Sequence, residues 1–164
     1  MLERIDAKKI VKLVDTYVNG DLKLSSQINK IEIILNSKEF RQYIARNGKI
    51  IVTKKGLIRL LNQFIDNKVT IQQLNKLSYF VLAFGDDILS YERSNEELDD
   101  SITEVMEEFD YLDEFDKEGK PLNGEFTKER AEKLINYLKK DGWIKLFNEH
   151  IKIKFNNLYG ENEK

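Results

Sequence analysis

Carboxylate side chains are concentrated between Glu96 and Glu118, where the chain has its greatest potential for chemistry. This stretch holds twelve carboxylates and one cation, Lys117, so its net charge is −11. Paired carboxylates can act as acid and base in hydrolysis, but their abundance here singles out no pair. A dense negative surface also speeds encounter with a basic partner. The twelve are Glu96, Glu97, Asp99, Asp100, Glu104, Glu107, Glu108, Asp110, Asp113, Glu114, Asp116 and Glu118.

The end of this stretch partly matches a calcium-binding loop. Residues at positions 1, 3, 5, 6 and 12 of the EF-hand pattern are Glu114, Asp116, Glu118, Gly119 and Glu125. Glu114, however, stands where the shorter aspartate is expected. Pro121 occupies the apolar eighth position, where it offers no N–H to a second loop. We expect an acidic surface loop without a metal and keep calcium binding as an open alternative.

The chain lacks the residues that several other kinds of catalytic or metal site require. The chain has no cysteine, which excludes disulfides, thiolate metal sites and cysteine nucleophiles. Its one histidine, His150, has no second histidine with which to form a relay or a metal site. Gly48, Gly56 and Gly85 are isolated and form no phosphate-binding loop. We therefore expect a protein that is not an enzyme and has no cofactor.

The elements that would carry these residues are mostly helices. The 164 residues with one proline predict a mainly α, single-domain bundle of six to eight helices, with at most one short β-hairpin. We expect the domain to cover residues 1–159 and residues 160–164 to form a frayed tail. Residues 143–155 fit either a helix or a hairpin. Helix-capping patterns occur at Ser37, Thr53, Thr70 with Gln73, and Thr127.

The acidic stretch itself is predicted to be one helix from Ser94 to Lys117, opened by a capping box of Ser94 and Glu97. Like charges three or four residues apart destabilise a helix, so twelve acids suggest selection for a negative surface. Its inward stripe is predicted to be Leu98, Ile102, Val105, Met106, Phe109, Leu112 and Phe115. Its predicted partner-binding residues are Asp99, Asp100, Glu104, Glu107, Glu108, Asp110, Tyr111, Asp113 and Glu114. Tyr111 is the expected aromatic anchor.

An internal repeat is a further hypothesis. Residues 10–24 align with residues 57–71 at an offset of 47 positions, with apolar residues matched to apolar residues. Each copy would be a helical hairpin, the first over 5–46 and the second over 53–85. Any two amphipathic hairpins align about this well, and a solenoid normally needs at least three repeats.

The first half of the chain is basic and supports an alternative function. Residues 1–85 carry a net charge of +8 and residues 86–164 carry −10, which together give −2. Residues 40–56 could form two strands about the turn Asn47-Gly48, like the wing of a winged-helix DNA-binding regulator. The cations of this region are Arg41, Arg46, Lys49, Lys54 and Lys55. The segment that precedes residues 40–56 contains no clear recognition helix rich in Arg, Lys, Asn and Gln. We therefore expect a protein partner rather than nucleic acid.

Part of the chain carries a family resemblance. An amphipathic helix (Leu60-Leu61-Asn62-Gln63-Phe64), a polar turn (Asp66-Asn67-Lys68) and a capped helix (Thr70-Ile71-Gln72-Gln73-Leu74) precede an acidic helix and a final capped helix. This stretch, Leu57 to Leu138, resembles small helical immunity proteins of bacterial polymorphic toxin and contact-dependent inhibition systems. It is about half of the chain and leaves out the first 50 residues. The resemblance implies a non-enzymatic inhibitor that blocks a cognate toxin, and it transfers no binding residue.

The expected location and partner follow from these patterns. The N-terminus shows no signal-peptide pattern, and the apolar run of residues 80–84 is far too short to span a bilayer. We expect a cytoplasmic protein with no membrane partner. Its predicted partner is a basic protein, a bacterial toxin domain whose positive groove the acidic helix would occupy.

Overall fold

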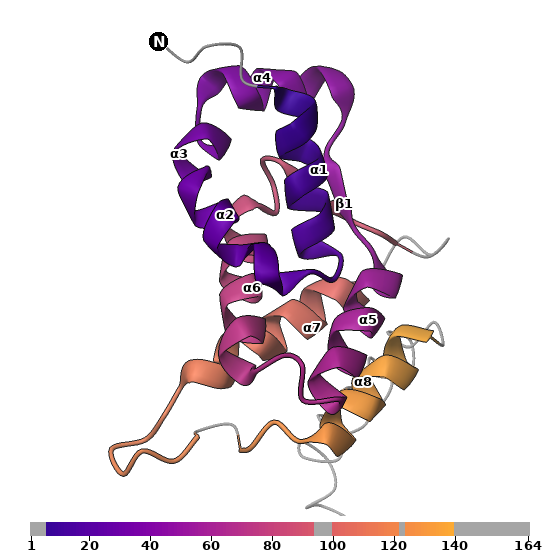
Figure 1. Ribbon diagram of the computed structural model, residues 1–164. Coiled ribbons are helices and arrows are strands. Elements are labelled where there is room, and N and C mark those ends of the chain that lie inside the picture. Colours follow the sequence, from indigo (N-terminus) through magenta and orange to yellow (C-terminus); the bar gives the residue numbers. More distant parts are fainter. Residues whose placement is uncertain (1–5, 94–99, 122–123, 140–164) are drawn as a thin grey trace, which may run out of the picture.

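Eight α-helices and two short strands make up most of the chain in a computed structural model, which describes residues 6–93, 100–121 and 124–139 (Figure 1). Two 3-10 turns, η1 and η2, complete the described elements. The predicted mainly α fold with six to eight helices is confirmed. In chain order the elements are α1 (Ala7–Val18), η1 (Leu22–Leu24), α2 (Ser25–Lys30), α3 (Glu32–Leu35), α4 (Lys38–Asn47), β1 (Ile50–Val52), α5 (Lys54–Ile65), α6 (Ile71–Phe84), β2 (Leu89–Tyr91), α7 (Ser101–Asp110), η2 (Tyr111–Asp113) and α8 (Lys128–Lys139).

Side-chain caps begin several of these helices where the sequence predicts them. The hydroxyls of Ser37 and Thr53 accept hydrogen bonds from the backbone N–H three residues later. Thr70 and Gln73 form a full capping box at α6. The hydroxyl of Thr127 accepts from the N–H of Arg130 at the start of α8. These caps satisfy N–H groups that a helix start leaves without partners.

The two strands pair in parallel, so the hairpin predicted within residues 40–56 is wrong. Residues 143–155, which fitted a helix or a hairpin, lie outside the described residues. Ile50 lies opposite Leu89 and Val52 opposite Tyr91. Residues 40–46, which would have formed its first strand, lie instead in α4, which begins after the cap residue Ser37. Gly48 ends α4 with φ of +98°, and the chain then enters β1.

One hydrophobic cluster runs through the described elements, from Ile10 in α1 to Leu138 in α8. Among the later helices, α5 packs mainly against α8, and α6 packs mainly against α7. Figure 1 shows α1 and α4 at one end of the molecule and α5, α7 and α8 at the other. The two segments of the hypothetical repeat differ: α6 is one helix, whereas its counterpart is divided into α2 and α3.

A side-chain junction joins α1 to α5. The Asn19 amide donates to the carbonyl of Ile51 at 2.9 Å, and its oxygen accepts from the N–H of Thr53 at 2.8 Å. Gly56 lies directly against this residue, since a Cβ at position 56 would be 2.7 Å from the Cα of Asn19. The crossing of the two segments therefore requires glycine.

Candidate functional site

The acidic helix is shorter than predicted. Helix α7 begins at Ser101 and ends at Asp110, the turn η2 follows, and Glu114 is extended with ψ of 119°. The prediction of a helix to Lys117 is therefore wrong. The Asn75 side chain of α6 donates to the carbonyls of Phe109 and Asp110, both at 3.1 Å. These hydrogen bonds satisfy backbone carbonyls that the end of α7 leaves without partners in the helix. Residues 94–99, including Asp99 and the predicted capping box, lie outside the described residues.

Apolar packing fixes which side of α7 faces inward. Ile102, Val105, Met106 and Phe109 are buried as predicted. Leu112 is half-buried. Phe115, predicted on the same inward stripe, is 55% exposed, because the chain has left the helix before reaching it. Leu98 lies outside the described residues.

Two of the predicted binding carboxylates contact α8 instead of pointing freely outward. Glu108 accepts two hydrogen bonds from the Arg130 guanidinium, at 2.6 Å to Nε and 3.0 Å to Nη2. This pairing raises the pKa of Arg130. The Tyr137 hydroxyl donates to the Glu104 carboxylate. Glu104 and Glu108 thus help to hold α7 against α8 and are less available to a partner.

Of the remaining predicted site residues, Asp100 lies at the start of α7, and the others lie in its last turn or just after it. Asp100, Glu107, Asp113 and Glu114 are exposed, and Asp110 is half-buried. The last turn of α7 holds no basic residue, although a helix C-terminus carries a partial negative charge. Burial, and after it the charges of Asp86 and Glu107, raise the pKa of Tyr91 in β2.

This concentration of acid should cost stability. Replacing Glu107 by lysine is expected to raise the free energy of unfolding by about 0.3–1 kcal/mol, because a cation complements the C-terminus of α7. Urea denaturation measures the change. The matched variant Glu129→Lys puts a cation in the first turn of α8 and should lower the free energy of unfolding by a similar amount. Destabilisation by Glu107→Lys would contradict this electrostatic cost.

Two aromatic side chains stand exposed among these carboxylates. Tyr111 is 50% exposed, and Phe115 is 55% exposed. The sequence identified Tyr111 as an anchor and missed Phe115, although the turn residues Asp116 and Gly119 behind it could have indicated that the helix ends earlier. Aromatic residues are enriched at the centres of protein interfaces. Exposed aromatic side chains among carboxylates are therefore suited to contact a basic protein surface.

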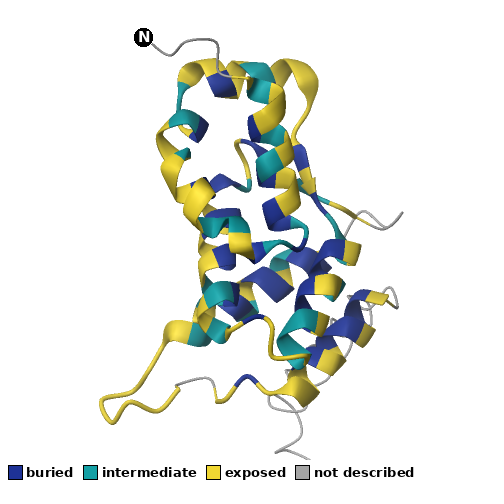
Figure 2. Cartoon of the chain, viewed as in Figure 1, coloured by how far each residue is buried: buried dark blue, intermediate teal, exposed yellow. Residues whose placement is uncertain are grey.

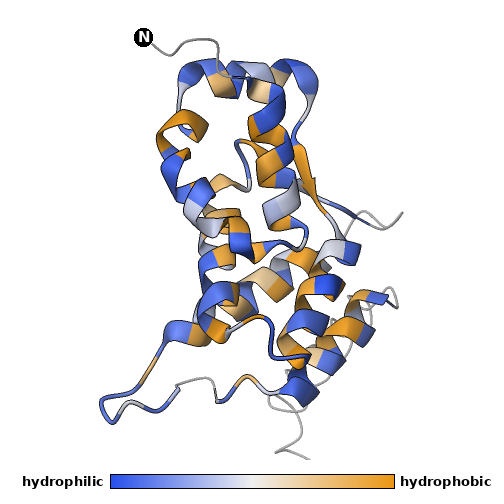
Figure 3. Cartoon of the chain, viewed as in Figure 1, coloured by the Kyte–Doolittle hydropathy of each residue, from blue (hydrophilic) through white to orange (hydrophobic). Residues whose placement is uncertain are grey.

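The loop after η2 is organised by its own hydrogen bonds. Asp116 accepts from the backbone N–H of Glu118 at 2.8 Å and of Lys120 at 2.9 Å. Phe115 and Pro121 form an isolated antiparallel bridge across it. Figure 2 shows this loop exposed along its length, and Figure 3 shows it mostly hydrophilic. Within residues 6–93, 100–121 and 124–139, no group of three or more acidic or histidine side chains is placed to hold a metal ion.

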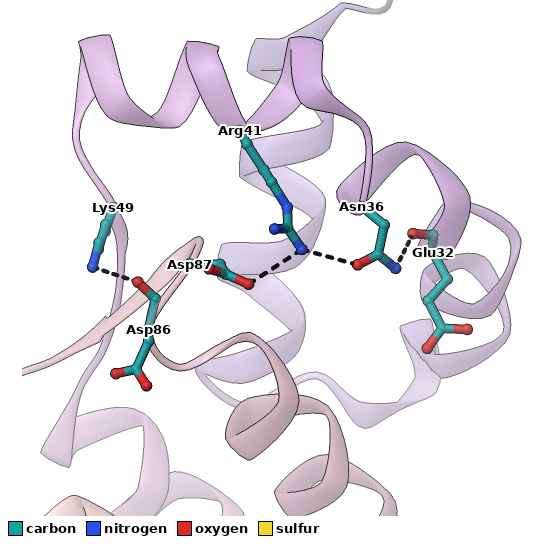
Figure 4. Close-up of polar contacts among 6 residues, drawn as sticks. All are labelled: Glu32, Asn36, Arg41, Lys49, Asp86 and Asp87. Atoms are coloured by element: carbon teal, nitrogen blue, oxygen red, sulfur yellow. Dashed lines mark hydrogen bonds and ion pairs between the residues drawn. The ribbon is translucent and has the colours of Figure 1, made fainter.

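The basic region lacks the predicted wing, and two of its cations contact the segment before β2 (Figure 4). The Arg41 guanidinium lies 3.2 Å from the Asp87 carboxylate and also donates to the side-chain oxygen of Asn36. The Lys49 ammonium donates to the backbone carbonyl of Asp86 at 2.7 Å. These contacts tie α4 and β1 to the end of α6.

Comparison of the chain with protein-family models, with curated proteins and with solved structures found no match. Among the helices of the described part of the chain, none is both long and apolar enough to span a bilayer.

Proposed function

We propose that this chain is a non-enzymatic inhibitor of the immunity-protein kind, which binds a basic toxin through the acidic surface formed by residues 100–118. The observation that supports the proposal is the exposure of Tyr111 and Phe115 within a segment of nine carboxylates and one cation. Carboxylates accelerate encounter with a positive groove, and aromatic side chains supply buried contact area once the groove is reached. The bound inhibitor would then exclude the toxin's substrate.

The cost of this surface to the fold points the same way. Glu107, Asp110 and Asp113 lie at or just beyond the negative end of α7, and no basic residue lies in its last turn. Charges placed against a helix dipole are expected to reduce stability. A function that requires negative charge at this place explains why the chain bears that cost.

A charge-reduced variant tests the proposal. The three substitutions Glu107→Lys, Asp110→Asn and Asp113→Lys change the charge by +5 and spare Glu104 and Glu108. We expect wild-type protein to capture a basic protein from a lysate of the source cell at low salt and to release it at high salt. The variant should capture little of it. The captured protein should also arrest bacterial growth when expressed, and co-expression of the wild-type chain should restore growth.

The matched control changes the same charge elsewhere, through Glu39→Lys, Asp66→Asn and Glu132→Lys, which are exposed positions on other elements. It should capture the partner and protect cells as the wild type does. Equal capture by the charge-reduced variant and the control would exclude the acidic surface. Capture without any effect on growth would exclude the inhibitor role. Recovery of DNA instead of protein would favour the alternative function, a winged-helix DNA-binding regulator. Without that result the regulator stays a prediction, because residues 40–56 do not form the wing.

A further inference from the structure

Helix α6 exposes an apolar ridge that the sequence did not single out. Tyr79 is 66% exposed and Leu82 is 36% exposed, and Ala83 beside them is also exposed. The neighbouring positions Phe80 and Val81 are buried, as the inward face of this helix requires. We call Tyr79, Leu82 and Ala83 the α6 ridge.

Two hollows border the α6 ridge. One has a volume of about 230 Å³, and the other of about 250 Å³. Tyr79 and Ala83 line both, so the two hollows meet at the ridge. Each is smaller than the roughly 300–1,000 Å³ of a typical small-molecule site, which suits them to single side chains of a protein. The first hollow is also lined by Tyr17, whose pKa burial raises to about 12, and by the charged residues Glu32 and Lys76.

The ridge is continuous with the acidic surface. Asp110 lines the second hollow together with Tyr79 and Leu82. The Asn75 side chain, one turn before Tyr79 on α6, holds the backbone of Asp110 in that place. Turn η2, which carries Tyr111 and Asp113, also packs against α6. The apolar α6 ridge and the acidic surface therefore lie side by side.

We propose that the α6 ridge anchors the basic partner by receiving an amphipathic cationic helix. Apolar side chains of that helix enter the two hollows across Tyr79, while its Lys or Arg side chains face Asp110 and Asp113. This inference rests on the proposed function and names the contact that holds the partner after charge has guided it. An arginine stacked on the Tyr79 ring would add a cation–π contact. Steering by charge acts mainly on the association rate, and an aromatic anchor acts mainly on dissociation.

Two synthetic peptides test this assignment. The first is an amphipathic helix of two Leu-Lys-Lys-Leu-Leu-Lys-Lys heptads, and the second has the same lysines with serine in place of leucine. Each is titrated into the full-length ¹⁵N-labelled protein. We expect the amphipathic peptide to shift the amide signals of Tyr79, Leu82 and Ala83. The serine peptide should shift signals of residues 100–118 and leave the ridge unchanged.

Substitution of Tyr79 separates the ridge from the charge. Tyr79→Ser should weaken binding of the amphipathic peptide about tenfold and leave binding of the serine peptide unchanged. Tyr79→Phe should retain binding. Because Tyr79 is exposed, both variants should unfold at nearly the wild-type temperature, which is checked first.

Failure of the ridge and failure of the function give different results. Equal affinity of wild type and Tyr79→Ser for the amphipathic peptide, or no shift at the ridge, overturns the ridge assignment. The function still stands if the charge-reduced variant loses both peptides. If that variant binds both peptides as the wild type does, the acidic surface falls as well. A photo-crosslinker at position 79 that labels a second copy of the chain, or residues 140–164 of the same chain, also overturns the assignment.

Discussion

Replacing Phe109 by alanine is expected to lower the free energy of unfolding by about 3–5 kcal/mol. Phe109 is fully buried, and its ring meets the ring of Phe126 edge-on with centroids 5.9 Å apart. Its carbonyl also accepts from Asn75, so the residue fixes the end of α7 both by packing and by a hydrogen bond. The substitution removes the ring contacts and leaves a cavity between α7 and the segment before α8. Urea denaturation followed by circular dichroism measures the loss.

Phe115 supplies the control for this prediction. It has the same side chain on the same acidic segment but is 55% exposed. Phe115→Ala should change the free energy of unfolding by no more than about 0.5 kcal/mol. Equal losses for the two substitutions would mean that Phe115 is part of the core, against the structure described above. A small loss for Phe109→Ala would mean that α7 is not held by this residue.

Replacing Gly56 by alanine is expected to destabilise the protein by about 3 kcal/mol, although glycine-to-alanine changes inside helices usually stabilise by up to about 1 kcal/mol. The added Cβ would lie 2.6 Å from the Oδ1 and 2.7 Å from the Cα of Asn19. The Cα is backbone and cannot rotate away, so α5 must move from α1. That movement would stretch the hydrogen bonds from Asn19 to Ile51 and Thr53.

The control is Ala45→Gly at an exposed position of α4, which should cost only the helix propensity of about 1 kcal/mol. Thermal and urea unfolding of both variants give the comparison. A stabilised Gly56→Ala protein would contradict the close approach of α1 and α5.

Local signals explain why much of the fold can be predicted from the sequence. A cap at Ser37, Thr53 or Thr70 involves residues only three positions apart, so the pattern and the contact coincide. The parallel pairing of β1 with β2 joins residues 39 positions apart, such as Ile50 and Leu89. No local pattern encodes that pairing, and Asn47-Gly48 instead suggested a hairpin.

The candidate site shows the same division. Glu104, Glu107 and Glu108 are alike in the sequence, and all three follow the spacing of an outward helical face. Only the position of α8 shows that Glu108 pairs with Arg130 and that Glu107 remains exposed. The exposure of Phe115 depends likewise on where α7 ends, which the Asn75 side chain on another helix helps to determine.

The most direct test of the acidic surface is the association rate constant of the captured basic partner, measured against ionic strength. The electrostatic screening length is about 30 Å at about 0.01 M salt and about 3 Å at about 1 M. Association that is accelerated by opposite charges therefore slows steeply as the salt concentration rises. We predict a steep decline for the wild type, the same decline for the Glu39, Asp66 and Glu132 control, and a slower, nearly salt-independent association for the Glu107, Asp110 and Asp113 variant. Equal rates and equal salt dependence in all three proteins would contradict the claim that residues 100–118 bind a basic partner.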